Sequence, residues 1–136
     1  MGRILALDPG SARVGVAVSD ALKMTGQPHS VLDGGDPGLM GSIVRLVTEL
    51  DVERIVVGLP VSLDGGEGPA AVKARSFAEA VADATGLPVD LQDERFSTVT
   101  AERVLREGGL SGKRRRRVRD RLAAAVFLQA YLDRRS

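Results

Sequence analysis

The chain has 136 residues, of which 43% are hydrophobic, 27% are charged and none is cysteine. This length suits a single domain spanning residues 1–136, and the lack of cysteine excludes disulfides, thiolate catalysis and cysteine-type zinc sites. No apolar stretch approaches the roughly 20 residues that a membrane-spanning helix needs, and no secretory leader is visible, so we expect a cytoplasmic protein without membrane contact.

The formal net charge of +1 conceals an uneven distribution of charge along the chain. Residues 1–94 carry 7 Lys/Arg and 14 Asp/Glu, whereas residues 95–136 carry 12 Lys/Arg and 4 Asp/Glu. The basic segment indicates a polyanionic partner, with a merely solvated basic loop as the alternative. Aromatic residues make up only 3% of the chain, which disfavours base stacking on single strands and favours contacts with the backbone of structured nucleic acid.

The first part of the chain predicts a meander of strands. Residues 3–8 and 14–19 have the pattern of a hairpin whose turn lies at residues 9–13, and a third strand is expected within residues 28–32. Apolar residues at helical spacing then predict an amphipathic helix over residues 37–50. The short apolar run at residues 54–58 is typical of a parallel strand that is covered on both faces.

The second part of the chain predicts alternating helices and strands. A helix is expected over residues 71–85, ended by Gly86, and a fifth strand over residues 89–92. Ser97 or Thr98 can cap a helix that reaches about residue 106, and a last helix is expected over about residues 115–134. This order predicts an α/β fold with a mixed five-stranded sheet and helices on both faces.

Three acidic residues follow or continue apolar segments, where a carboxylate needs a cation or a hydrogen-bond donor as a partner. Asp8 ends the apolar run of the first strand, and Glu94 ends the fifth strand. Strand alternation sends Asp93 and Glu94 to opposite faces, and we assign Glu94 to the site. Asp120 continues an apolar stripe of the last helix, which is formed by Ala124, Phe127 and Tyr131.

Convergent carboxylates favour a divalent-metal site. Burying a lone carboxylate is costly, whereas three of them together are typical ligands of Mg²⁺ or Mn²⁺. In metal-assisted hydrolysis Asp8 would be the bridging ligand, with Glu94 and Asp120 on either side, and the sequence leaves open whether one ion or two are bound. The alternatives are a salt bridge from Asp120 to an arginine and a solvated Glu94 at the strand end.

Basic residues near these acids are candidates for phosphate contacts. Arg95 directly follows Glu94 and precedes a predicted helix start, where backbone amides also bind phosphate. The run at residues 113–117 is rich in arginine, which contacts phosphate in bidentate fashion. The candidate nucleic-acid-binding residues are Arg13, Arg95, Lys113, Arg114, Arg115, Arg116, Arg117 and Arg121.

Four segments resemble one known family, in the same order along the chain. They are "LALDPGSARVGVAVSD", "IVVGLPVSLDG", "LQDERFSTVTAE" and "RDRLAAAVFLQAYLD". Together they resemble the YqgF (RuvX) family of Holliday-junction-resolvase-like proteins, also described as candidate pre-16S rRNA nucleases. The resemblance implies a ribonuclease H-like fold and metal-dependent cleavage of phosphodiester bonds, with Asp8, Glu94 and Asp120 as the catalytic and metal-binding acids and Mg²⁺ or Mn²⁺ as the cofactor.

The substrates implied by this resemblance are structured RNA, above all pre-16S rRNA at its 5′ end, and branched DNA. Related junction resolvases commonly carry a fourth carboxylate one helical turn after the helix acid, where this chain has Ala123, so junction resolution carries less support. The rival hypothesis is a non-catalytic RNA-binding factor of ribosome maturation. A third, an actin-like ATPase, needs a longer chain with two such domains. The sequence leaves a homodimer open.

Overall fold

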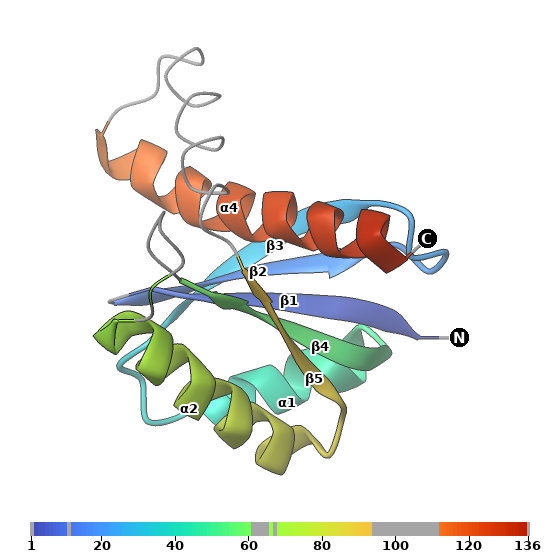
Figure 1. Ribbon diagram of the computed structural model, residues 1–136, viewed down its shortest axis with the longest axis horizontal. Coiled ribbons are helices and arrows are strands. Elements are labelled where there is room, and N and C mark those ends of the chain that lie inside the picture. Colours follow the sequence, from blue (N-terminus) through green and yellow to red (C-terminus); the bar gives the residue numbers. More distant parts are fainter. Residues whose placement is uncertain (1, 11, 61–65, 67, 94–111, 136) are drawn as a thin grey trace.

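The computed structural model of the protein describes residues 2–10, 12–60, 66, 68–93 and 112–135, with side chains in the last segment described for residues 121–134. Five strands form one mixed sheet in the order β3-β2-β1-β4-β5. Helices α1 and α2 cover one face and helix α4 covers the other (Figure 1). The predicted mixed five-stranded sheet with helices on both faces is therefore confirmed.

The first three strands form an antiparallel meander. They are β1 (Arg3–Pro9), β2 (Arg13–Ser19) and β3 (Gly26–Asp33). The turn between β1 and β2 is closed by the N–H of Gly10, which donates to the carbonyl of Arg13 at 2.8 Å. The third strand is longer than predicted because it is an edge strand, where Pro28 is tolerated and is no strand breaker.

The remaining elements build the parallel half of the sheet. Helix α1 (Leu39–Glu49) leads to β4 (Val52–Leu59), which runs parallel to β1. Helix α2 (Pro69–Thr85) leads to β5 (Val89–Asp93), which runs parallel to β4. Gly86 ends α2 with a φ of 71°, a left-handed conformation that favours glycine, as the sequence predicted.

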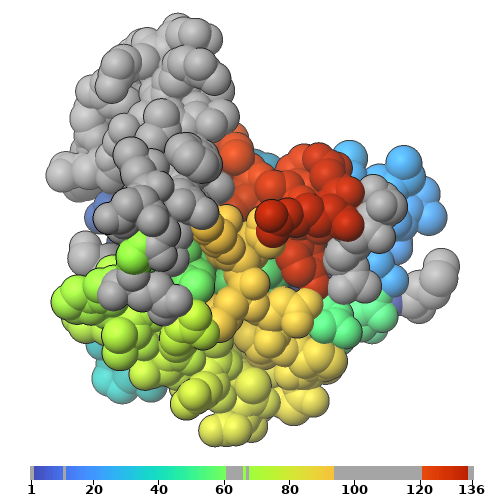
Figure 2. All heavy atoms as spheres, viewed as in Figure 1, coloured from blue at the N-terminus to red at the C-terminus, as the bar shows by residue number. Residues whose placement is uncertain are grey.

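Helix α4 (Gly112–Arg135) is the last element and begins three residues earlier than predicted. In space-filling form, α2, β5 and the C-terminal part of α4 occupy neighbouring regions of one face of the molecule (Figure 2). The helix that was predicted to start at Ser97 or Thr98 lies outside the described residues. Within the part of the chain that the structure describes, no helix has the combined length and apolar character that crossing a membrane requires.

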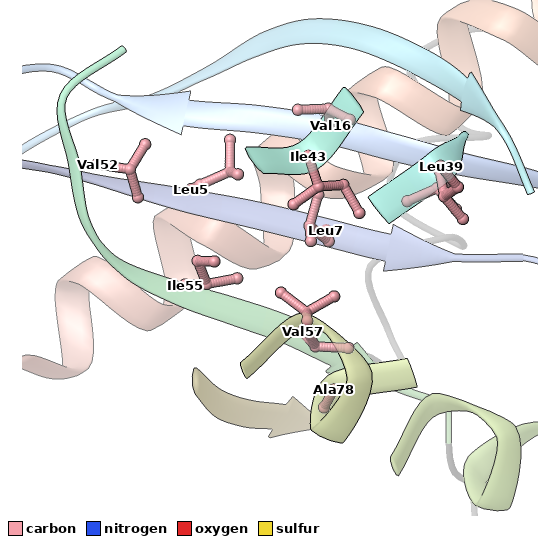
Figure 3. Packing of buried hydrophobic residues seen from close by; sticks show 11 residues of the cluster. Leu5, Leu7, Val16, Leu39, Ile43, Val52, Ile55, Val57 and Ala78 are labelled. Carbon is pink, nitrogen blue, oxygen red and sulfur yellow. The ribbon is translucent and has the colours of Figure 1, made fainter. Parts of the chain in front are cut away.

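Apolar side chains of the sheet form two cores, one on each face. On the side of α1 and α2, Leu5 and Leu7 of β1 pack with Ile43 of α1 and with Ile55 and Val57 of β4 (Figure 3). The core on the side of α4 is formed by the strand residues that alternate with these and by the inner face of the helix. Its fully buried members are Ala6, Ala17, Val56, Ala124, Phe127 and Leu128. The central strands are thus buried on both faces, as the apolar run of β4 predicted.

Candidate metal and nucleic-acid site

Asp8 lies near the carboxyl end of β1 and is half-buried. The side chains of β1 alternate between the two cores: Leu5 and Leu7 pack towards α1 and α2, and Ile4 and Ala6 pack towards α4. Because this alternation has a period of two, Asp8 belongs to the face that α4 covers. The apolar run of β1 therefore leads to a carboxylate near the end of the strand, on the face of the sheet that α4 covers.

Glycine flanks Asp8 on both neighbouring strands. Asp8 pairs with Gly15 of β2. On the other side, β1 and β4 match Leu7 to Val57, so the next position brings Gly58 alongside Asp8. Neither adjacent strand therefore places a side chain beside the carboxylate, and glycine inside a strand is typical of sites where a ligand approaches the backbone closely.

The carboxyl ends of β1, β4 and β5 lie at the same edge of the sheet because the three strands are parallel. Gly58 pairs with Gln92 and Leu59 pairs with Asp93, the last residue of β5. Asp90 and Gln92 both bond to α4, so alternation assigns the exposed Asp93 to the opposite face. Glu94 follows Asp93 directly and lies outside the described residues, so its assignment to the site stays a prediction.

The C-terminal half of α4 lies over the start of β1. The N–H of Gly26 donates to Oε1 of Gln129 at 3.0 Å, which ties the helix to the beginning of β3. Gly26 pairs with Ser19 at the end of β2, and Oγ of Ser19 accepts the N–H of Ile4 at 2.9 Å. Gln129 is therefore level with Ile4 along the direction of the strands.

Helix α4 runs antiparallel to β1 (Figure 1), so residues before Gln129 lie towards the carboxyl end of β1. From Ile4 to Asp8 a strand advances by about 13 Å. From Gln129 back to Asp120 an α-helix advances by about 13.5 Å. Position 120 of the helix is therefore level with Asp8, although the side chain of Asp120 lies outside the described part of the structure.

The predicted inner stripe of α4 is confirmed. Ala124 and Phe127 are fully buried, and Tyr131 is 7% exposed, all in the core between α4 and the sheet. Asp120 stands one helical turn before Ala124 on this stripe. Ala123, three residues after Asp120, is also buried, at 3% exposure.

The basic residues predicted to bind nucleic acid lie near the same edge where the structure describes them. Arg13 is the first residue of β2, is half-buried, and shares the α4 face with Gly15 and Ala17 by alternation. Arg121 is half-buried on α4, next to Asp120. The run at residues 113–117 forms the first turns of α4, with its side chains undescribed, and Arg95 lies outside the described residues.

The donor set suits a hard divalent cation. Among the described side chains there is no cluster of three or more potential ligands, and Glu94 and the side chain of Asp120 lie outside the described set. The residues assigned to the site are all carboxylates, with no histidine or cysteine among them. Carboxylate oxygens are the ligands that Mg²⁺ and Mn²⁺ prefer, whereas zinc and copper favour imidazole or thiolate. Asp8 beside two glycines therefore fits the implied metal.

Sequence reasoning missed three features of this region. The pairing of Asp8 with Gly15, and its position beside Gly58, depend on strand register, which an isolated sequence does not display. Gly58 was interpreted only as the end of an apolar strand. The polar contacts of Asp90 and Gln92 with α4 were also missed, and alternating polar residues in the pattern of β5 were the only available signal.

Comparison with known proteins gives nearly full-length matches. A family model described as "RuvX: Holliday junction resolvase" matches residues 2–134. A protein of Syntrophomonas wolfei named "Putative pre-16S rRNA nuclease" is 46% identical over 132 residues, which are 96% of this chain and 94% of that protein. A protein of Anaeromyxobacter with the same name is 47% identical over 132 residues, 96% of each chain.

Solved structures share the fold at low sequence identity. Thermus thermophilus RuvC in complex with a Holliday junction substrate has a TM-score of 0.59 and 17% identity, over 100% of this chain and 97% of that one. A second structure of the same RuvC has a TM-score of 0.55 over 98% of this chain and 96% of that one. These matches confirm the ribonuclease H-like fold, and together with the family model and the relatives they show that this chain belongs to the RuvX (YqgF) family.

Proposed function

We propose that this protein is a metal-dependent nuclease that hydrolyses phosphodiester bonds of structured nucleic acid in the cytoplasm, with pre-16S rRNA as its first candidate substrate. The observation that carries the proposal is the position of Asp8: near the carboxyl end of β1, on the α4 face of the sheet, with a glycine beside it on each neighbouring strand. The names of the curated relatives support the choice of substrate.

In this proposal Asp8, Glu94 and Asp120 hold Mg²⁺ or Mn²⁺. When bound, such an ion lowers the pKa of a coordinated water and neutralises charge that develops on the phosphate. The three carboxylates repel one another in the absence of a cation, so metal binding and assembly of the site are coupled. Gly15 and Gly58 add no side chain beside Asp8 on the two neighbouring strands.

Orientation of the substrate is assigned to the basic residues at this edge. Arg13 lies on the same face and at the same end of the sheet as Asp8. Arg95, Arg121 and the run at residues 113–117 add charge close in sequence to Glu94 and Asp120. Guanidinium groups contact phosphate oxygens with paired hydrogen bonds, so these arginines would hold the nucleic-acid backbone while the carboxylates act at the scissile bond.

The test is a panel of substrates incubated with Mg²⁺, with Mn²⁺ and with a chelator. The panel holds a pre-16S rRNA 5′ segment, an unrelated RNA duplex, a linear DNA duplex and a four-way DNA junction. We expect cleavage of the pre-16S segment with either metal and none with the chelator, because the carboxylates need the cation. Cleavage confined to the junction would assign the substrate to branched DNA. Tight binding of RNA without cleavage under any metal condition would contradict the nuclease and favour a non-catalytic binding factor.

A further inference from the structure

A polar network joins β4, β5 and α4 on the α4 face of the sheet. Nη1 of Arg54 lies 3.1 Å from Oδ2 of Asp90, and the hydroxyl of Tyr131 donates to the same oxygen. We call Arg54, Asp90 and Tyr131 the tyrosine anchor. Beside it, Nη1 of Arg134 donates to Oε1 of Gln92 at 3.2 Å. Figure 2 shows the C-terminal part of α4 lying against β5 at this place.

Tyr131 of the tyrosine anchor stands on the same helical stripe of α4 as position 120. Tyr131 is eleven residues after Asp120, and eleven residues exceed three full turns by only about 20°. The two positions therefore share one side of the helix. Any rotation of α4 about its own axis at Tyr131 changes the direction of the stripe at position 120 by a similar angle.

The buried side chains of α4 nearest to position 120 are small, whereas the large ones, Phe127 and Leu128, lie closer to Tyr131. Ala123, Ala124 and Ala125 are all buried, at 3%, 0% and 6% exposure. Alanine allows α4 to approach the sheet closely, but it makes no directional contact that resists rotation. The hydrogen bond from Tyr131 to Asp90 is directional, and Arg54 holds its acceptor in place.

A second contact holds α4 on its other side. Oε1 of Gln129 accepts the N–H of Gly26, and Nε2 of Gln129 donates to the carbonyl of Met24 at 3.0 Å. Loss of the Tyr131 hydroxyl would therefore leave the helix attached to the sheet while removing a restraint on its rotation. A helix with its side chains is about 10–12 Å wide, so a rotation of about 20° moves side-chain tips by about 2 Å.

We infer that the tyrosine anchor is a positioning element of the nuclease site: it sets the rotation of α4 and thereby the direction of the stripe that carries Asp120. This inference rests on the function proposed above. Arg54 pairs with Ile4 near the start of β1, whereas Asp8 lies near its carboxyl end, so the anchor acts through the helix. A displacement of about 1 Å in a catalytic constellation can cost about 10²-fold in rate, so a weakened anchor is expected to be visible in catalysis.

The experiment compares Tyr131→Phe with the wild type in two measurements: the affinity for Mn²⁺, and the kcat and KM of metal-dependent cleavage. Phenylalanine keeps the buried ring and removes only the hydroxyl. We expect Mn²⁺ affinity and kcat each to fall about 10-fold, as for other residues that orient metal ligands, with KM changed less than about 2-fold. Asp90→Asn keeps an acceptor for the Tyr131 hydroxyl, so its Mn²⁺ affinity and kcat should fall less than those of Asp90→Ala.

Ile43→Val is the matched control because Ile43 is fully buried on the opposite face, in α1. It should lower the melting temperature at least as much as Tyr131→Phe and leave Mn²⁺ affinity and kcat unchanged. If the wild type binds Mn²⁺ and Tyr131→Phe keeps full affinity and kcat, the positioning role is wrong while the proposed function stands. If the wild type neither binds Mn²⁺ nor cleaves any substrate, the proposed function is wrong and this inference fails with it.

Discussion

Asp8→Asn is expected to lower metal-dependent cleavage by about 10³-fold or more while the fold is retained. Asparagine has nearly the same shape as aspartate but carries no charge, so it removes the attraction for the cation and leaves the strand unchanged. A metal ion supplies several kcal/mol of transition-state stabilisation, and each 1.36 kcal/mol corresponds to about a factor of ten in rate. The measurement is single-turnover cleavage with saturating Mg²⁺, together with thermal unfolding of both proteins.

Asp93→Asn is the matched control for this variant. Asp93 ends β5 at the same edge of the sheet as Asp8, is exposed, and belongs to the opposite face by alternation. Its replacement should leave cleavage close to the wild-type rate. Mg²⁺ or Mn²⁺ should also raise the melting temperature of the wild type and of Asp93→Asn, but not that of Asp8→Asn, because only a protein that binds the ion is stabilised by it. Undiminished turnover by Asp8→Asn would remove Asp8 from the site.

Binding of structured RNA is expected to weaken by about 10³-fold between 50 and 200 mM salt. Residues 95–136 carry 12 Lys/Arg, and the run at residues 113–117 lies in the first turns of α4, at the end of the helix on the same side as the carboxyl end of β1 (Figure 1). If about six phosphates are contacted, counterion release produces this dependence on salt. The measurement is a titration of labelled RNA at several salt concentrations, without divalent metal.

Replacing Arg114, Arg115, Arg116 and Arg117 together by alanine should reduce the slope of log affinity against log salt by up to about four. Alanine keeps the helical propensity of this segment, so a change in slope reports on charge and not on the helix. Lys73→Ala on the exposed side of α2 serves as the control, since α2 covers the other face of the sheet. Binding that is indifferent to salt would contradict a role for the basic run and would favour a merely solvated segment.

The fold could be predicted well from the sequence because each element carries its own pattern. The hairpin pattern of β1 and β2, the glycine that ends α2 and the buried stripe of α4 are local signals, and the structure confirms each of them. The third strand was predicted too short because Gly26 and Pro28 suppress the strand pattern, although an edge strand tolerates both.

For the site, the sequence predicts only those features that depend on residue type and on the periodicity of strands and helices. Asp8 was identified because a carboxylate ends an apolar strand, and its face follows from the two-residue alternation. Its glycine neighbours follow from the register of β1 with β2 and β4, and the contact of Tyr131 with Asp90 follows from the direction in which α4 crosses the sheet. Register and crossing direction are set by tertiary packing, which local sequence patterns do not report.

The most direct test of the account is to locate the metal itself. Crystals of the wild-type protein grown with Mn²⁺ would reveal the ion through its anomalous scattering. We predict a peak bonded to the carboxylate of Asp8 at the carboxyl end of β1, with Glu94 and Asp120 completing the protein ligands. A Mn²⁺ ion bound elsewhere, with the carboxylate of Asp8 outside its coordination sphere, would contradict the central claim.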